Sequence, residues 1–261
     1  MSAKKIWISW LSEQEDPVLQ QTLRDLQSVG LLVSGAPFID DLEKCAWTEL
    51  AEHLCAEPDI WLIGGTPEQF AQPSVRYALS LISLNLSINK PALPVFVFNA
   101  QDQQSISLPP LCHNFTVLTS GPGWAAKVVA GAYSNTKNQL ETGVHVNMIA
   151  QSAIGQWFEL GPEQQSANWQ GAMFGIPKGQ GEILFQAVGQ RGQLPDKTVN
   201  EYPMNGIELE INGDEYVACA LKNTVSDQQA YYIKVKGFPS NIIIGDHPET
   251  ADAEVHCIQL S

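Results

Sequence analysis

Hydrophobic residues are spaced differently in the two halves of the chain. Up to about residue 137, short continuous apolar runs alternate with stretches whose apolar residues recur every three or four positions. Continuous apolar runs are typical of strands buried on both faces of a sheet, and the longer spacing is typical of amphipathic helices. The predicted strands are residues 5–10, 31–33, 59–63, 93–98 and 114–118, and the predicted helices are residues 18–29, 42–54, 74–86 and 124–133.

This alternation predicts the fold class of the first half. Strands separated by helices form parallel sheets that helices cover on both faces, and the crossover connections are right-handed. We therefore expect a flavodoxin-like α/β domain over residues 1–137. Its five-stranded, doubly wound parallel sheet should have the order 2-1-3-4-5.

The second half contains short strands and no helical spacing. The predicted strands are residues 144–148, 182–188, 207–211, 216–221, 231–235, 241–244 and 254–260. Asn212 and Gly213 predict a two-residue hairpin loop with Ile211 opposite Asp214, because this pair accepts positive φ at both turn positions. We expect an all-β sandwich or small barrel over residues 143–261.

Composition and charge narrow the possible functions. The chain has 28 acidic and 14 basic residues, a net charge of −14, which argues against binding to nucleic acid or to anionic membrane. No apolar run has the length of a membrane span, and residues 1–5 precede a run too short for a signal peptide. Five cysteines without paired spacing fit reduced thiols. We expect a cytoplasmic protein with neither a nucleic-acid nor a membrane partner.

The histidines and cysteines do not have the spacing of a metal site. Cys45 and Cys55 are ten positions apart, about 15 Å along a helix, which is too far for one zinc ion. No Gly-x-Ser-x-Gly motif marks a nucleophile. The sequence therefore predicts neither a metal nor another cofactor.

The order of several predicted elements is shared with known families. These elements are the strand Ile6–Trp10, the acidic loop that ends at Asp16 and the strands at residues 59–63 and 94–98. Over residues 4–134 this order resembles TIR-type domains and nucleoside deoxyribosyltransferase-like proteins, both of flavodoxin-like build. In those families, a glutamate near the start of the helix after the third strand engages the ribose during N-glycosidic cleavage. The matching stretch here, residues 72–79, contains no carboxylate. The resemblance therefore implies the fold without that activity.

The first candidate ligand site lies where the order of the strands reverses, because ligands bind there in doubly wound sheets. The predicted crevice is lined by Ser9, Ser12, Gly64, Gly65 and Thr66. Acidic residues crowd the neighbouring helix N-terminus, where they satisfy the helix dipole and repel phosphate: Glu13, Glu15 and Asp16. Tight turns with a self-capped helix are therefore the preferred interpretation.

A second candidate is the loop formed by Ser120, Gly121 and Gly123, which precedes a helix and contains no acid. Free N–H groups at a helix N-terminus favour an anion. The loop lacks the lysine of a P-loop, so an ordinary turn is again the preferred interpretation.

The remaining candidates are carboxylates near the same sheet edge and one cation. Glu68 follows the third strand, and Asp40 and Asp41 follow the second. Solvation of Glu68 and capping of the helix at residues 42–54 by the two aspartates are the preferred interpretations. Arg76 could hold a phosphate or carboxylate of a bound ligand.

Aromatic residues in the second half allow two interpretations. Trp157, Phe158, Trp169, Met173 and Phe174 can form either a surface patch for a protein partner or part of the core. We favour the core.

Three functions remain open. The preferred hypothesis is a non-catalytic binding or regulatory protein that takes a protein partner or a small nucleotide-like ligand. The alternative is an N-glycosidase or nucleotide-processing enzyme that uses Glu68, Asp40 or Asp41. In the third, the β domain recognises the ligand and the α/β domain is its scaffold.

Overall fold

The computed structural model describes residues 3–12, 16–101, 104–134, 140, 142–163, 168–245, 247 and 255–261. The chain divides into two compact units, Met1–Leu140 and Glu141–Ser261. The predicted domains end at residue 137 and begin again at residue 143, and residues 135–139 and 141 lie outside the described residues.

The first unit contains the predicted five-stranded parallel sheet, with the order β2-β1-β3-β4-β5. Its strands are β1 (Lys5–Trp10), β2 (Leu32–Pro37), β3 (Ile60–Gly65), β4 (Val95–Asn99) and β5 (Thr116–Leu118). All residues of β3 and β4 are buried, as their continuous apolar sequences require. The order of the strands reverses between β1 and β3, so the carboxyl ends of these two strands mark the switch point.

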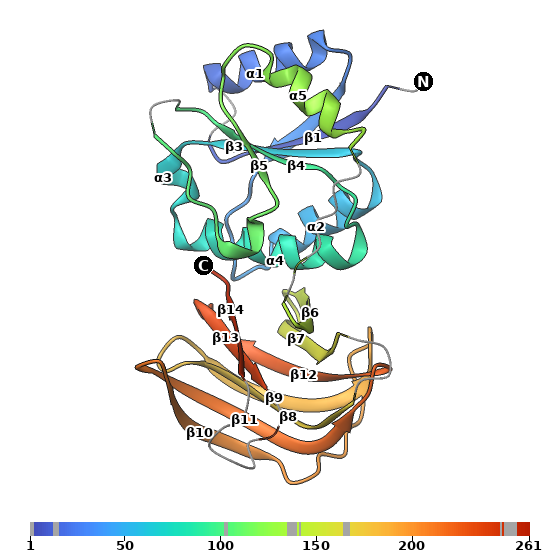
Figure 1. Cartoon of the computed structure of the whole chain (residues 1–261), viewed down its shortest axis with the longest axis vertical. Helices are drawn as coiled ribbons and strands as arrows, with labels where there is room; N and C mark the ends of the chain where they lie inside the picture. The colour runs from blue at the N-terminus through green and yellow to red at the C-terminus, as the bar shows by residue number, and fades with distance from the viewer. Residues whose placement is uncertain are drawn as a thin grey trace. The chain divides into compact units, whose positions relative to one another are not determined.

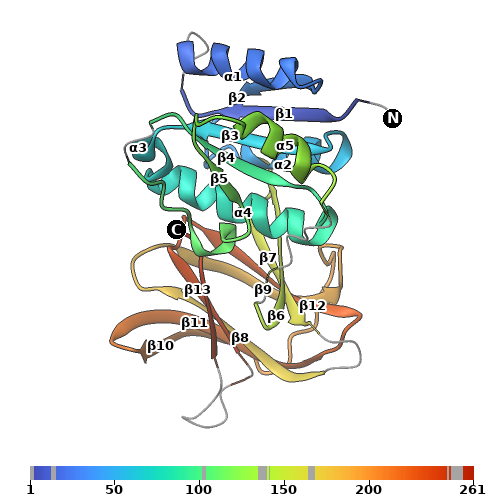
Figure 2. The ribbon, with the colours of Figure 1, turned by 45° about the horizontal axis from the view of Figure 1, so that its top comes forward.

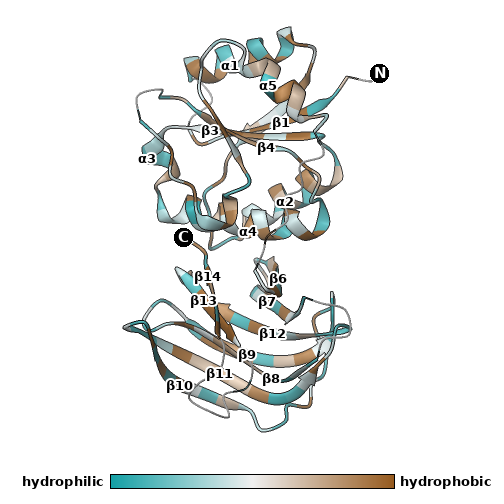
Figure 3. Ribbon diagram, in the orientation of Figure 1, coloured by the Kyte–Doolittle hydropathy of each residue, from teal (hydrophilic) through white to brown (hydrophobic). Residues whose placement is uncertain are grey.

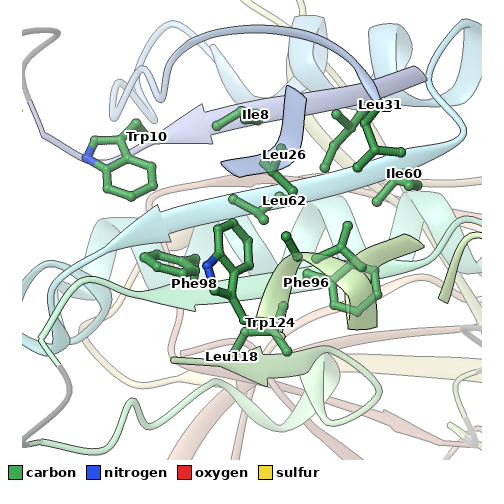
Figure 4. Packing of buried hydrophobic residues seen from close by; sticks show 13 residues of the cluster. Ile8, Trp10, Leu26, Leu31, Ile60, Leu62, Phe96, Phe98, Leu118 and Trp124 are labelled. Carbon is green, nitrogen blue, oxygen red and sulfur yellow. The ribbon is translucent and has the colours of Figure 1, made fainter. Parts of the chain in front are cut away.

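Helices cover both faces of this sheet (Figure 1). They are α1 (Pro17–Ser28), α2 (Trp47–Ala56), α3 (Pro67–Phe70), α4 (Pro73–Asn89) and α5 (Trp124–Gly131), with a 3-10 turn, η1 (Pro110–Cys112). Leu26 of α1 and Trp124 of α5 pack on Leu62 and Phe98 of the sheet (Figure 4). Helix α1 carries both hydrophobic and hydrophilic residues, as a helix on the surface of a sheet does (Figure 3).

In the first unit, two element boundaries differ from the predicted ones by four residues or more. Strand β2 continues to Pro37 instead of ending at Val33. Helix α2 begins at Trp47 instead of Leu42, because Cys45 has a φ of 53° and a positive φ interrupts a right-handed helix. The short helix α3 has too few residues for a helical period to be visible in the sequence.

The second unit consists of two antiparallel sheets (Figure 2). One has the order β10-β11-β8-β13-β14 and the other β6-β7-β12-β9. The strands are β6 (Val144–Gln151), β7 (Gly155–Pro162), β8 (Trp169–Pro177), β9 (Glu182–Gln190), β10 (Met204–Ile211), β11 (Asp214–Val225), β12 (Gln229–Lys236), β13 (Asn241–Gly245) and β14 (Val255–Gln259). The rings of Phe158 in β7 and Phe174 in β8 meet between the sheets, 5.3 Å apart, so the unit is a β-sandwich.

The predicted hairpin is confirmed. Asn212 and Gly213 have φ values of 53° and 90°, and Ile211 pairs with Asp214. Both turn residues adopt the positive φ that a two-residue hairpin loop requires.

Strands β7 and β8 are absent from the predicted elements. From Gly171 to Pro177 every residue of β8 is buried, so its sequence does not alternate. Phe158, Met173 and Phe174 belong to the core, whereas Trp157 and Trp169 are half-buried. The core interpretation of this aromatic group therefore holds for the three fully buried residues.

Across the described part of the chain, the helices are too short or too polar to cross a membrane.

Candidate functional site

The carboxyl ends of β1 and β3, where the sequence predicts a crevice, are closed by the protein itself. Leu11 N donates to Gly64 O at 2.9 Å. A Cβ on Gly64 would stand 1.9 Å from the Trp10 ring, and one on Gly65 would stand 2.9 Å from Leu11 Cβ. The two glycines therefore make room for the side chains of β1 and its loop.

The hydroxyl groups at this edge have partners within the fold. Ser9 is 1% exposed, and its Oγ accepts a hydrogen bond from Trp61 Nε1 at 3.1 Å. Thr66 caps α3: its Oγ1 accepts from Gln69 N at 3.4 Å, and its own N–H donates to Gln69 Oε1 at 2.8 Å. These groups hold strands and turns together.

Asp16 caps α1, in agreement with the preferred sequence interpretation. Its carboxylate accepts from Trp10 Nε1 at 2.9 Å, Ser12 Oγ at 2.8 Å and Val18 N at 2.8 Å. Burial raises the pKa of Asp16, but these three hydrogen bonds outweigh burial and hold the pKa below its ordinary value. The other acids predicted at this terminus lie outside the described residues: Glu13 and Glu15.

The three carboxylates considered for catalysis have separate surroundings. Glu68 is exposed on α3. Asp40 accepts from Ser74 Oγ at 2.6 Å, at the start of α4, and does not cap α2. The carboxylate of Asp41 accepts two hydrogen bonds from Lys44, one from the ammonium Nζ at 2.8 Å and one from the backbone N–H at 3.0 Å. These hydrogen bonds lower the pKa of Asp41.

Arg76 lies in the first turn of α4. Its Nη1 donates to Ser107 O at 2.7 Å, and its neighbours Val75 and Tyr77 are buried. The guanidinium thus fixes the chain after β4 to α4.

The loop at residues 120–123 begins α5 without a side-chain cap. Gly123 has a φ of 78° at the N-cap position. Trp124 Nε1 donates to Asp25 Oδ2 at 3.3 Å, so a carboxylate already lies beside the first residue of α5. Ser120 also interacts within the fold, and Gly121 O accepts from Trp124 N at 3.3 Å. A negative charge next to this terminus disfavours an anionic ligand.

Where the structure describes His, Cys, Asp and Glu side chains, no three of them are grouped closely enough to hold a metal ion.

Among the described residues, no strand pairs with the outer edge of β2. β2 pairs with β1 on one side, and five of its six residues are exposed. The N–H groups of Leu32 and Phe38 donate to Lys4 O and Trp10 O, each at 2.9 Å, and so point toward β1. Because successive N–H groups of a strand point in opposite directions, those of Val33 and Gly35 point away from the sheet. Pro37 has no N–H to present.

This edge carries no charge. In a chain with a net charge of −14, the 14 residues between Asp25 and Asp40 include neither an acid nor a base. Edge strands are usually protected by charges, bulges or a covering element. The uncharged run with its small residues at 34–36 was the signal in the sequence that could have revealed the edge.

A hollow of about 410 Å³ lies between β2 and α1. We call it the α1-side hollow. Apolar side chains line it, among them Leu19, Leu23 and Val33, with the amides of Gln20 and Gln27 beside them. None of its lining residues is charged. Its volume lies within the range of ligand pockets, roughly 300–1,000 Å³.

A second hollow, of about 210 Å³, lies between β2 and α2. We call it the α2-side hollow. Trp7, Phe38, Trp47 and His53 line it together with Glu49, and the rings of Trp7 and His53 are 4.0 Å apart. The indole N–H groups of Trp7 and Trp47 are buried, and among the described residues neither has a hydrogen-bond partner. An unpaired buried donor costs about 1–3 kcal/mol.

Both hollows include Ala36 and Pro37, so they lie on opposite sides of the same stretch of β2. A strand added beyond β2 would extend the sheet, and its side chains would point alternately toward the two hollows.

No protein-family model matches the sequence, and no curated protein matches it.

The second unit contains a buried charged cluster around Glu159. This residue is 1% exposed, and its carboxylate accepts from His145 Nε2, Tyr232 OH and Gly192 N, each at 2.8 Å. Burial raises the pKa of Glu159, but the three hydrogen bonds outweigh burial and leave the pKa below its ordinary value. The donors come from three separate segments, so sequence spacing gives no sign of the cluster. Its contacts join the turn after β9 to β6, β7 and β12, which is a structural role.

Proposed function

We propose that the chain is a non-catalytic binding protein that takes an extended segment of another protein at the open edge of β2. The observation that carries this proposal is an exposed, uncharged edge strand with a hollow on each side. Main-chain hydrogen bonds to Val33 and Gly35 supply affinity in this mode of recognition, and the hollows take alternate side chains.

The contacts of the candidate carboxylates favour binding over catalysis. Cleavage of a base from ribose develops positive charge on the sugar, and a carboxylate held against the ribose stabilises that charge. The stretch that the resemblance matches to this carboxylate, residues 72–79, contains Arg76 and no acid, and Asp40 and Asp41 are engaged by Ser74 and Lys44.

We therefore expect the purified protein to release no nicotinamide from NAD and no base from nucleosides. Product formation is measured by chromatography against a control without protein. Turnover that disappears in the Glu68→Gln variant would contradict the proposal, and turnover that survives this change would direct attention to Asp40 and Asp41.

Peptides selected on the full chain from a random displayed library test the binding function. Val33→Pro removes one outward N–H, and proline is tolerated at edge positions. The loss of one hydrogen bond, about 1–1.5 kcal/mol, should weaken the selected peptides roughly tenfold. The control variant Val33→Ala also removes the branched valine side chain but keeps the backbone N–H, and it should weaken binding less than Val33→Pro. Affinities are measured by calorimetry.

A second measurement does not depend on the folding of a variant. Peptide binding to the unmodified chain should slow hydrogen exchange at the amides of Val33 and Gly35. Selected peptides that leave this exchange unchanged and bind Val33→Pro with full affinity would contradict binding at the β2 edge.

A further inference from the structure

Resting on the proposed function, we infer that the partner segment carries an aliphatic and an aromatic residue at adjacent positions, with basic residues next to them. The aliphatic residue enters the α1-side hollow and the aromatic residue enters the α2-side hollow. Three features of the described residues lead to this rule: the shared position of the hollows, their different linings and the charge around them.

The shared position sets the spacing. Both hollows include Ala36 and Pro37, so they overlap along β2 at these two residues. Neighbouring residues of a strand point to opposite faces, whereas residues two apart point to the same face. Adjacent residues of an added strand that lie level with Ala36 and Pro37 therefore reach both hollows, whereas residues two apart cannot.

The linings select the side chains. Leu19, Leu23 and Val33 give the α1-side hollow an aliphatic surface, which suits Leu, Ile or Val. The α2-side hollow is lined by Trp7, Trp47 and other rings, and aromatic pairs are favourable beyond the area that they bury. An aromatic side chain such as tyrosine therefore suits this hollow.

Charge selects the flanking residues and argues against a second copy of the chain. Residues 40–49, which follow β2, contain one lysine and the four acids Asp40, Asp41, Glu43 and Glu49. Glu49 also lines the α2-side hollow. A basic segment is attracted to this end of the strand, whereas a second copy would bring a net charge of −14 toward an equal charge.

Two blocked peptides of equal composition test the spacing. The adjacent peptide is Lys-Thr-Thr-Leu-Tyr-Thr-Thr-Lys, and the spaced peptide is Lys-Thr-Leu-Thr-Tyr-Thr-Thr-Lys. Each is also made with Leu and Tyr exchanged, so that either strand direction can be accommodated. Affinities are measured by NMR titration of the full chain. We expect the better adjacent peptide to bind at least tenfold more tightly than both spaced ones.

Matched changes test the individual hollows. Leu23→Trp fills the α1-side hollow and should remove the advantage of Leu over Ala in the adjacent peptide. Gln21→Trp places the same ring on an exposed position of α1 outside that hollow and should leave the advantage intact. Replacing Tyr by Ala should weaken binding at least tenfold. Replacing both peptide lysines by Glu should weaken it about fivefold, with a smaller difference at high salt.

The outcomes separate the two levels of inference. Equal affinities of adjacent and spaced peptides, with the amides of Val33 and Gly35 protected in both complexes, would overturn the adjacency rule and leave the edge-binding function standing. Failure of all four peptides to bind, together with failure to select any peptide that protects these amides, would overturn both. Protection of the same amides by self-association, detected by sedimentation of the chain alone, would assign the edge to a second copy instead.

Discussion

Replacing Gly64 by Ala is expected to destabilise the first unit by about 2–3 kcal/mol. The new Cβ would stand 1.9 Å from the Trp10 ring. This ring has little room to retreat, because its Nε1 donates to Asp16 and its face packs near Phe98, with ring centroids 6.1 Å apart. Displacing the ring would also weaken the cap of α1. Urea unfolding of the full chain, followed by tryptophan fluorescence, measures the effect.

A matched glycine provides the control. Gly121→Ala adds the same methyl group where the nearest heavy atom is 4.0 Å away, and should change stability by less than about 0.5 kcal/mol. Combining Gly64→Ala with Trp10→Leu should cost less than the sum of the two single changes, because the shorter side chain vacates the contested space. Additive effects would show that the overlap with Trp10 is not the cause.

Replacing Glu159 by Gln is expected to destabilise the second unit by about 2–4 kcal/mol at neutral pH. The amide of glutamine cannot accept from His145, Tyr232 and Gly192 together, because one of its two terminal groups is a donor. Hydrogen exchange detected by mass spectrometry should show faster opening of β7 and β12. The exposed control Glu182→Gln removes the same charge and should have little effect.

The pKa of Glu159 also predicts how the free energy of unfolding depends on pH. The folded state holds the pKa of Glu159 below its ordinary value, which is about 4.3 in an unfolded chain. The stabilisation by its charge is therefore fully present above that ordinary value and is lost as the pH falls through the folded pKa. The difference in stability between the unmodified chain and Glu159→Gln should shrink in the same range. A difference that stays constant with pH would contradict this role of the carboxylate.

The sequence predicts the fold far better than the site. Continuous apolar runs such as Ile60–Ile63 indicate buried parallel strands, and the order of the sheet follows from the helices between them. The pair Asn212–Gly213 specifies its hairpin through a local backbone preference. The true start of α2 depends on the positive φ of Cys45, a residue type that gives no sign of it.

Contacts between distant segments account for most of what the sequence does not reveal. In the sequence, Gly64 and Gly65 predict a turn that a ligand could approach. In the structure, the space beside them is filled by Trp10 of β1 and by Leu11, which follows β1. The hollows beside β2 depend on how closely α1 and α2 pack against this edge strand. The spacing of apolar residues in the sequence does not predict that packing distance. The absence of charge between Asp25 and Asp40 is readable in the sequence, and it is the one local sign of that edge.

The strand order of the sandwich also has a consequence for synthesis and folding. β8 lies between β11 and β13, although β8 ends at Pro177 and β13 begins only at Asn241. On the ribosome, β8 must wait with one side unpaired until the segment that forms β13 has emerged, and β7 must likewise wait for β12, which begins only at Gln229. Pairing between strands distant in sequence is slow. The first unit can therefore complete its sheet while the second is still unfinished, and β7 and β8 are the parts of the nascent chain that need protection from association with other chains.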